Sequence, residues 1–237
     1  VLCCNNICNC MTKWYENIAR MCNVPLIMID IPYNNTVEVH DTNVAYVRAQ
    51  FDHAIKQLEE LTGKKFDEKK FEEACANANR TASAWLRVCD YLQYKPAPYS
   101  GFDLFNHMAD VVTARGRVQA AEAFEQLEKD LAEAVKVGKS TTPFPEKYRV
   151  MFEGIPCWPK LPNLFKPLKE HGVNVTAVVY APAFGFVYNN MDEMVRAYYK
   201  APNSVCIEQG VSWREGICKD NKVDGVLVHY NRSCKPW

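Results

Sequence analysis

Short apolar runs that recur along the chain constrain its fold more than any other feature. They cover residues 24–31 (VPLIMIDI), 148–156 (YRVMFEGIP), 173–180 (VNVTAVVY) and 223–230 (VDGVLVHY). Such runs favour β-strands. The first is largely apolar and closed by Pro32, as expected for a strand of a parallel sheet that is buried on both faces. The sequence therefore predicts an α/β fold built on parallel strands.

A strand–helix–strand unit opens the chain. Residues 1–4 have the pattern of a strand end, and the Asn-Asn pair that follows favours a turn and a helix N-cap. Residues 7–22 carry apolar side chains at helical spacing and lead into the strand predicted at 24–31. We therefore expect a βαβ unit with a right-handed crossover.

A long helical block interrupts this α/β pattern. Between residues 41 and 137, apolar residues recur at helical spacing and no strand is expected. The first helix should end at Gly63, and the second should cover residues 66–92. A third helical region is expected over residues 105–137, with a break at Gly116. The block is predicted to be an insertion into, or a cap on, an α/β core.

A Pro- and Thr-rich connector at residues 139–146 marks the predicted domain boundary. Residues 1–145 are expected to hold the C-terminal part of a first α/β domain together with the helical block. Residues 146–237 are expected to hold the N-terminal part of a second α/β domain. The chain begins at Val1 and stops at Trp237, just after a predicted strand, so we expect an internal piece of a longer polypeptide.

Composition excludes several classes of function. The chain carries 28 basic and 28 acidic residues, so it has no positive excess to neutralise phosphates, and a nucleic-acid partner is not expected. No apolar run approaches the roughly 18–20 residues of a membrane span. No cleavable signal peptide is recognisable either.

Eleven cysteines in 237 residues are an unusually high number. A disulfide framework belongs to short secreted chains with small cores, whereas this chain has ample apolar residues for a core. Four of the cysteines fall within one short stretch, at positions 3, 4, 8 and 10. This clustering favours a reducing cytoplasm and a metal-binding role for a few of them.

The cysteines of two segments lie where chemistry is expected. Cys4 and Cys8 flank the turn between the first strand and the first helix, and Cys234 follows the last predicted strand. Open parallel sheets bind ligands at the carboxyl ends of their strands. A helix N-terminus also stabilises thiolates and other anions. The loop at residues 185–190 follows a strand too, but an ordinary connecting loop explains it equally well.

Spacing narrows the choice of metal only in part. Thiolates select iron–sulfur clusters, zinc or copper(I), but the cysteines match neither the radical-SAM pattern nor a zinc ribbon. The competing interpretation is that each cysteine packs as a small hydrophobic residue. For any of the first four cysteines the two interpretations weigh equally. Packing is preferred for the cysteines on later helices or their edges, which are Cys22, Cys75, Cys89, Cys206 and Cys218.

Five segments resemble one enzyme family. They are similar to the α subunits of 2-hydroxyacyl-CoA dehydratases, a family that includes related subunits of benzoyl-CoA reductase. The segments are LCCNNICNCMTKWYENIAR, VPLIMIDIPYN, IPCWPKLPNLFKPL, VVYAPAFGFVYNN and VLVHYNRSCKPW. The resemblance covers the whole chain, and the motifs are long and collinear. It implies parts of two flavodoxin-like parallel-sheet domains with a large helical insertion.

The resemblance also implies a cofactor and its ligands. Members hold a [4Fe–4S] cluster through three cysteines of the subunit, with one iron left open. The second ligand maps to Cys8 and the third to Cys234, while Cys4 competes with Cys8 because both flank the same turn. The first ligand would lie upstream of residue 1, and no catalytic residue can be assigned. Some members also contain a flavin (FMN), for which nothing in this chain marks a site.

The reaction implied is that of a lyase of glutamate fermentation in anaerobes. It would dehydrate (R)-2-hydroxyglutaryl-CoA to glutaconyl-CoA. One electron added to the thioester carbonyl gives a ketyl radical that expels hydroxide, after which the β-proton becomes acidic. The implied partners are a homologous β subunit, the acyl-CoA substrate and an ATP-dependent iron–sulfur activator protein. The piece alone is expected to be inactive.

Two alternatives stay open. The first alternative is another enzyme of the family, either a dehydratase for a different 2-hydroxyacyl-CoA substrate or a benzoyl-CoA reductase-type subunit. The Asn-Asn-Ile-Cys and Ser-Cys-Lys-Pro motifs do not distinguish these enzymes from a dehydratase of 2-hydroxyglutaryl-CoA. The length of the match to the glutaryl-type subunit favours that substrate. A non-catalytic scaffold with buried cysteines would instead bind no iron and show no sensitivity to dioxygen.

Overall fold

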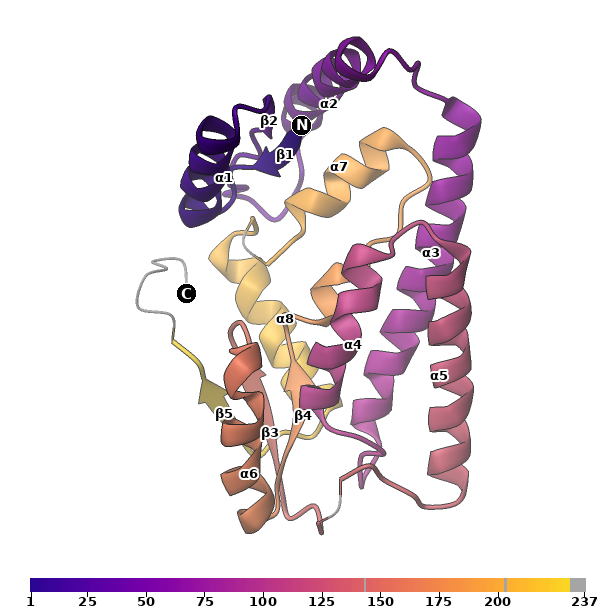
Figure 1. The fold of residues 1–237 in the computed structure, drawn as a ribbon. Helices are drawn as coiled ribbons and strands as arrows, with labels where there is room; N and C mark the ends of the chain where they lie inside the picture. The colour runs from indigo at the N-terminus through magenta and orange to yellow at the C-terminus, as the bar shows by residue number, and fades with distance from the viewer. Residues whose placement is uncertain (143, 203, 231–237) are drawn as a thin grey trace. The chain divides into compact units, whose positions relative to one another are not determined.

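The computed structural model describes residues 1–142, 144–202 and 204–230, and their ribbon is shown in Figure 1. The chain forms two compact units. Unit 1 comprises residues 1–72 and 188–210, and unit 2 comprises residues 73–187 and those from 211 onward. Every strand pair in the described residues is parallel, which confirms the predicted fold class.

Unit 1 contains the predicted βαβ segment. Strand β1 (Leu2–Asn5) pairs in parallel with β2 (Leu26–Ile29), and α1 (Asn9–Cys22) connects them. In β2 only Ile27 and Ile29 are buried, while the alternate residues are partly exposed. The prediction of burial on both faces is therefore wrong for this strand, since one face alone packs against the apolar side chains of unit 1.

The core of unit 1 lies between β2 and two helices. Helix α2 (Asp41–Thr62) and helix α7 (Met191–Tyr199) pack against each other and against this strand. The core consists of Ile27, Ile29, Ile31, Val44, Val47, Ala54, Val195 and Tyr199. The guanidinium of Arg196 in α7 donates 3.0 Å to the carbonyl of Val39 and pairs with Asp41, which fastens α7 to the start of α2.

The helical block continues in unit 2. It consists of α3 (Glu68–Asp90), the 3-10 helix η1 (Tyr91–Gln93), α4 (Gly101–Thr113) and α5 (Val118–Lys136). The third predicted helical region is thus two helices, and the break falls at Gly116, whose φ of 81° is easy for glycine alone. The described residues of the block contain no strand, as the periodicity predicted.

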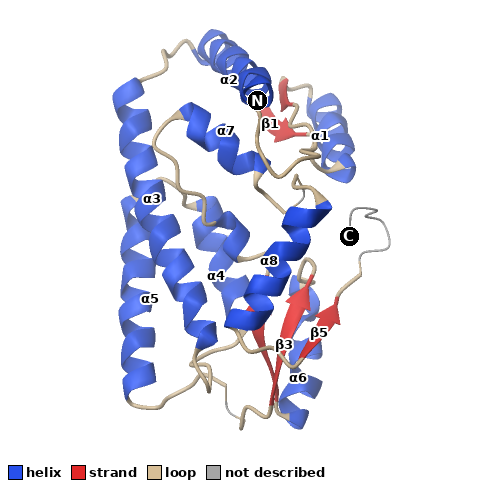
Figure 2. Ribbon diagram, turned by 180° about the vertical axis from the view of Figure 1, so that it is seen from behind, coloured by secondary structure: helices blue, strands red, loops and turns tan. Residues whose placement is uncertain are grey.

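The sheet of unit 2 has the order β4-β3-β5, with β3 (Tyr148–Glu153), β4 (Val173–Val178) and β5 (Gly225–Val228). Helix α4 and α6 (Leu161–His171) pack on one face of it, around Phe102, Phe105, Phe152 and Phe165. Helix α8 (Ile207–Asp220) covers the other face through Ile217, as Figure 2 shows. Two further 3-10 turns, η2 (Trp158–Lys160) and η3 (Pro182–Phe184), lie in the connections.

A buried ion pair fastens this sheet to the helical block. Arg149 in β3 and Glu146 lie 2.5 Å apart, and both side chains are almost fully buried. The Arg149 guanidinium also donates to the carbonyls of Leu92, Tyr94 and Asn221. This one side chain thereby links the end of η1, the sheet and the turn after α8.

The predicted strands are all present. Along the sequence, the strands of one sheet precede residue 145 and those of the other follow it. The division of the chain into two α/β domains at residues 145 and 146 stays a prediction. Among the described residues no helix is both long and apolar enough to cross a membrane.

Candidate functional site

The turn between β1 and α1 holds the first candidate ligands. Cys4 belongs to β1, and Cys8 is the N-cap residue of α1 with extended backbone angles (φ −118°, ψ 117°). The carbonyl of Cys8 accepts a hydrogen bond of 3.0 Å from the backbone N–H of Thr12, and its thiol makes no capping hydrogen bond. Residues 4 and 8 are therefore brought to one turn at the carboxyl end of a parallel strand, as predicted.

The surroundings of the Cys4 thiol affect its ionisation. Both cysteines are partly buried. Burial raises the pKa of the Cys4 thiol, and the charge of a nearby Cys8 thiolate raises it further. In the absence of a metal, Cys4 is thus held as the neutral thiol, with its Sγ 3.0 Å from the carbonyl oxygen of Asn5.

Asp30 anchors the turn from the neighbouring strand. Asn5 pairs in register with Ile29, so Asn6 and Asp30 leave the two strands side by side. The Asn6 amide donates to the Asp30 carboxylate, and its oxygen accepts 2.9 Å from the N–H of Ile31. The side chain of Asn6 is therefore held at both ends.

Helix α2 in turn holds Asp30. The phenol of Tyr46 donates 2.6 Å to the second carboxylate oxygen. The amide of Gln50 accepts 2.6 Å from the backbone N–H of Asp30 and donates 2.8 Å to its carbonyl. Donation to the carboxylate raises the pKa of Tyr46, with burial and the charge of Asp30 adding to the effect. An open pocket of about 230 Å³ lies beside this network, lined by Asn6, Ile7, Asp30, Ile31, Pro32, Tyr33 and Ser204.

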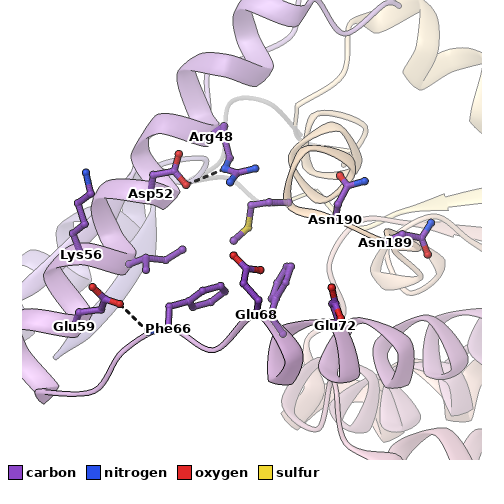
Figure 3. Close-up of a pocket in the computed structure, with 12 residues that line it drawn as sticks. Arg48, Asp52, Lys56, Glu59, Phe66, Glu68, Glu72, Asn189 and Asn190 are labelled. Atoms are coloured by element: carbon purple, nitrogen blue, oxygen red, sulfur yellow. Dashed lines mark hydrogen bonds and ion pairs between the residues drawn. The ribbon is translucent and has the colours of Figure 1, made fainter.

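A larger pocket of unit 1 has a different chemistry. It measures about 570 Å³ and lies between α2, the start of α3 and the start of α7 (Figure 3). Several of its charged groups already have partners within the protein. Arg48 pairs with Asp52 at 2.9 Å, and Glu59 accepts a hydrogen bond of 2.8 Å from the backbone N–H of Phe66. Asn189 and Asn190 line it as well; they come from the loop at residues 185–190, for which the sequence left a ligand-binding role and an ordinary connection equally open. No cysteine lies among its lining residues, so it offers no thiolate to a cluster.

Most of the other described cysteines are either packed or exposed, and Cys157 is of intermediate burial. Cys75, Cys89 and Cys206 are buried, and Cys218 packs with its Sγ 3.5 Å from the Met151 sulfur, which confirms packing roles for them. Burial raises the pKa of the Cys89 thiol well above its ordinary value. Cys22 is exposed, so the prediction of a packed cysteine is wrong there, because the last turn of α1 faces solvent. Cys3 and Cys10 are exposed too.

The ligand set is incomplete within the described residues. Cys234 lies outside them, and in the part that the structure describes no three His, Cys, Asp or Glu side chains converge to hold a metal ion. Thiols are nevertheless the donor type that iron–sulfur clusters require, and the turn offers Cys4 at the end of β1 and Cys8 at the N-terminus of α1, which has no side-chain cap. What the turn presents therefore fits a part of a cluster site that needs further ligands.

Sequence reasoning missed the anchoring network. Asp30 lies within the segment VPLIMIDIPYN but received no role there, and Tyr46 and Gln50 lie outside the segments that resemble the family. The contact between Asp30 and Asn6 depends on the register of two strands. One signal was available, since Tyr46 and Gln50 are four residues apart and so share a helix face.

Comparison with known proteins gives a family. The model of the 2-hydroxyglutaryl-CoA dehydratase, D-component family matches residues 1–237. Over its full length the chain is 76% identical to the α subunit of (R)-2-hydroxyglutaryl-CoA dehydratase of Acidaminococcus fermentans, of which it covers 50%. It is 54% identical to the (R)-phenyllactyl-CoA dehydratase α subunit of Clostridium sporogenes, covering 100% of this chain and 58% of that protein.

A more distant relative is a benzoyl-CoA reductase subunit, the type that the sequence left open as an alternative. A benzoyl-CoA reductase subunit of Thauera aromatica is 24% identical over 97% of the chain and 57% of the relative. The chain thus spans about half the length of the curated relatives it matches.

Proposed function

Because the chain belongs to the 2-hydroxyglutaryl-CoA dehydratase D-component family, we propose that it forms part of a subunit of a radical dehydratase. The proposed substrate is (R)-2-hydroxyglutaryl-CoA and the proposed product glutaconyl-CoA, in the fermentation of glutamate. The identity of 76% to the α subunit of that enzyme in A. fermentans carries this proposal. The lower identities to the phenyllactyl-CoA and benzoyl-CoA relatives support it over the two enzyme alternatives.

The cofactor proposed is a [4Fe–4S] cluster, with Cys8 and Cys234 as ligands and Cys4 as the alternative to Cys8. Support comes from the turn itself, where Cys4 lies near the carboxyl end of β1 and Cys8 lies at the N-terminus of α1. When bound, a low-potential cluster would supply the one-electron chemistry that makes the β-hydrogen of the substrate acidic.

The chain's own residues contribute binding and orientation in this proposal. The thiolate of Cys8 would hold iron, and the free N–H groups in the first turn of α1 would stabilise the negative charge of the bound group. Asn6 would hold the turn through its two hydrogen bonds. Burial raises the pKa of the Cys4 thiol, which disfavours Cys4 as an iron-binding thiolate.

The partners proposed are a homologous β subunit and an ATP-dependent iron–sulfur activator protein, in a reducing cytoplasm. The word alpha in the names of the relatives supports a second subunit, since those proteins are named as one of a set. Copurification of the complete subunit with a β subunit in the absence of dioxygen is the expected outcome. A complete subunit that remains monomeric when both genes are expressed together would contradict it.

The test of the site uses the complete dehydratase component purified without dioxygen. Cys8→Ala and Cys234→Ala should each lose iron and dehydration activity together, whereas Cys75→Ala and Cys89→Ala, which alter buried thiols, should keep both. Iron content by colorimetry and the EPR spectrum of the reduced protein give the answer. Retained iron and activity in Cys234→Ala would overturn the proposed ligand set, and loss of iron in Cys4→Ala but not in Cys8→Ala would make Cys4 the ligand.

A metal-free scaffold protein is the non-enzyme alternative. It predicts no brown colour and no iron in the complete component. The exposure of Cys3 and Cys10 and the partial exposure of Cys4 and Cys8 speak against it, because cysteines retained only for packing are among the most buried residues.

A further inference from the structure

The network around Asp30 joins three elements of unit 1 that the sequence separates. Asn6 follows β1, Asp30 follows β2, and Tyr46 and Gln50 lie on one face of α2. Each of the two carboxylate oxygens of Asp30 accepts one hydrogen bond, from Asn6 and from Tyr46. The backbone of Asp30 is clamped by Gln50 at both its N–H and its carbonyl. Asp30 is therefore held toward Asn6 by contacts to both its side chain and its backbone.

From these contacts we infer that Asp30 is a positioning residue for the candidate cluster ligand Cys8, acting through Asn6 and held by Tyr46 and Gln50 of α2. The inference rests on the proposed function, because it presumes that the turn holds a cluster. Asn6 and Cys8 are separated by one residue, so any tilt of Asn6 moves the N-cap of α1 and with it the thiol.

The chemistry of the neighbouring side chains suits a carboxylate at position 30. The Asn6 amide and the Tyr46 hydroxyl both donate to this side chain, so it must accept on both of its terminal atoms. An amide in its place would accept on one atom and present a second donor to one of the two. Groups that orient a metal ligand from behind influence the affinity for the metal through such bonds, although they never touch it.

A role for Asp30 as a general base is the competing explanation, because the residue lines the pocket of about 230 Å³. Both of its oxygens already accept hydrogen bonds from neutral donors, so a substrate would have to compete with Asn6 and Tyr46 for them. A base would affect turnover and leave the cluster unchanged. The two roles therefore differ in what they do to iron.

The experiment measures iron release from the complete dehydratase component under anaerobic conditions. The rate at which a ferrous chelator removes iron is compared among the wild type, Asp30→Asn and Tyr46→Phe. Tyr148→Phe is the matched control, since the Tyr148 side chain is 56% exposed against 49% for Tyr46 and lies in β3 of the other unit. The EPR spectrum of each reduced protein is recorded in parallel.

Asp30→Asn should release iron roughly 10- to 100-fold faster than the wild type, by analogy with the loss in metal affinity that is typical when a group orienting a metal ligand is removed. Tyr46→Phe should give a smaller increase in the same direction, because the bond from Asn6 to Asp30 remains. The g-values of the reduced cluster should shift in Asp30→Asn, which a general loss of stability would not cause. Tyr148→Phe should match the wild type in both measurements.

Different outcomes overturn the inference and the proposed function. If Cys8→Ala loses iron but Asp30→Asn keeps the wild-type release rate and spectrum, the positioning role is wrong and the cluster ligand stands. If Cys8→Ala keeps its iron, the ligand assignment fails first. Lower turnover in Asp30→Asn with unchanged iron release would make Asp30 a base instead. Should Asp30→Asn not fold, Tyr46→Phe decides, and a wild-type release rate in that variant overturns the inference.

Discussion

The two parallel sheets of this chain are held in place by different means. The sheet of unit 2 is covered on both faces by helices, and its β3 is buried from Arg149 to Glu153. The two strands of unit 1 are buried on one face at most, and α1 has no buried residue. At the carboxyl ends of these two strands, side-chain hydrogen bonds around Asp30 hold the turn.

This difference teaches how a turn that we propose to bear a cluster ligand can be made rigid. A turn that must leave room for a bulky group cannot be filled with apolar side chains, which would occupy the space themselves. Hydrogen bonds from the neighbouring strand end and from α2 hold the backbone without placing apolar side chains at the thiols. Unit 2 carries no candidate ligand in its described strands, and close packing serves it instead.

The strongest test of the contrast compares two tryptophans. Trp85 in α3 is fully buried, stacks edge-on against Phe124 and donates 3.0 Å to the carbonyl of Ala181, whereas Trp14 in α1 is 59% exposed. Trp85→Ala should destabilise unit 2 by about 3–5 kcal/mol, toward the upper end because a hydrogen bond is lost too. Trp14→Ala should stay within about 0.5 kcal/mol.

Amide hydrogen exchange in the complete component measures the local stability of each unit. A cost for Trp14→Ala as large as that for Trp85→Ala would break the contrast. It would show that the α1 face is covered in the complete component.

The buried ion pair of unit 2 gives the next largest effect. Glu146→Gln should cost about 3 kcal/mol, because it leaves the buried guanidinium of Arg149 without its counter-charge. The carbonyls of Leu92, Tyr94 and Asn221 still accept from Arg149, which keeps the cost at the lower end. Denaturant unfolding followed by near-UV circular dichroism measures it.

The matched control for this variant is Glu133→Gln. Glu133 pairs with Lys136 at 3.6 Å, and both side chains are largely exposed. Solvent screening leaves such a pair worth little, so the change should lie within about 0.5 kcal/mol. Equal costs for the two variants would mean that Arg149 is reached by water in solution.

A glycine pair sharpens the account of packing in unit 2. A Cβ at Gly101, the first residue of α4, would lie 2.8 Å from a methyl group of Val175 and 3.0 Å from one of Val178. Gly101→Ala should therefore cost about 1–3 kcal/mol through overpacking. Gly216→Ala in α8 meets nothing within 4 Å and should stabilise by up to about 1 kcal/mol. Thermal unfolding separates the two, and a neutral Gly101→Ala would show that α4 can move away from β4.

The contrast also explains what the sequence could predict. The strands of unit 2 follow from apolar runs, because a buried strand imposes its pattern on every residue. The run VPLIMIDI has the same apolar pattern, but in β2 the side chains on one face are partly exposed. Composition alone does not tell what covers a strand. The break at Gly116 was predicted because a positive φ favours one residue type.

The candidate site was predictable only in part. Cys4 and Cys8 were found because short-range spacing places them on one turn, and the resemblance named them as ligands. The pairing of Asn6 with Asp30 depends on the register between two strands, and local patterns do not fix a register. Arg149 was missed for a similar reason, since a charged residue inside a strand gives no sign that its partners are carbonyls far along the chain.

The smallest expected effect concerns the pH at which Tyr46 ionises. The hydrogen bond to Asp30 raises the pKa of Tyr46, so it should lose its proton above the value of about 10 that is ordinary for a tyrosine. The pKa is higher in the folded protein than in the unfolded chain. The contribution of this bond is therefore complete below about pH 10 and disappears as the pH rises through the folded-state pKa. The difference in ultraviolet absorbance between the wild type and Tyr46→Phe, followed against pH, isolates this one phenol. In Asp30→Asn the same difference should move back toward the ordinary value. If the wild-type phenol titrates at about 10, the bond between Tyr46 and Asp30 does not persist in solution, and α2 does not hold the turn as the contrast between the two sheets requires.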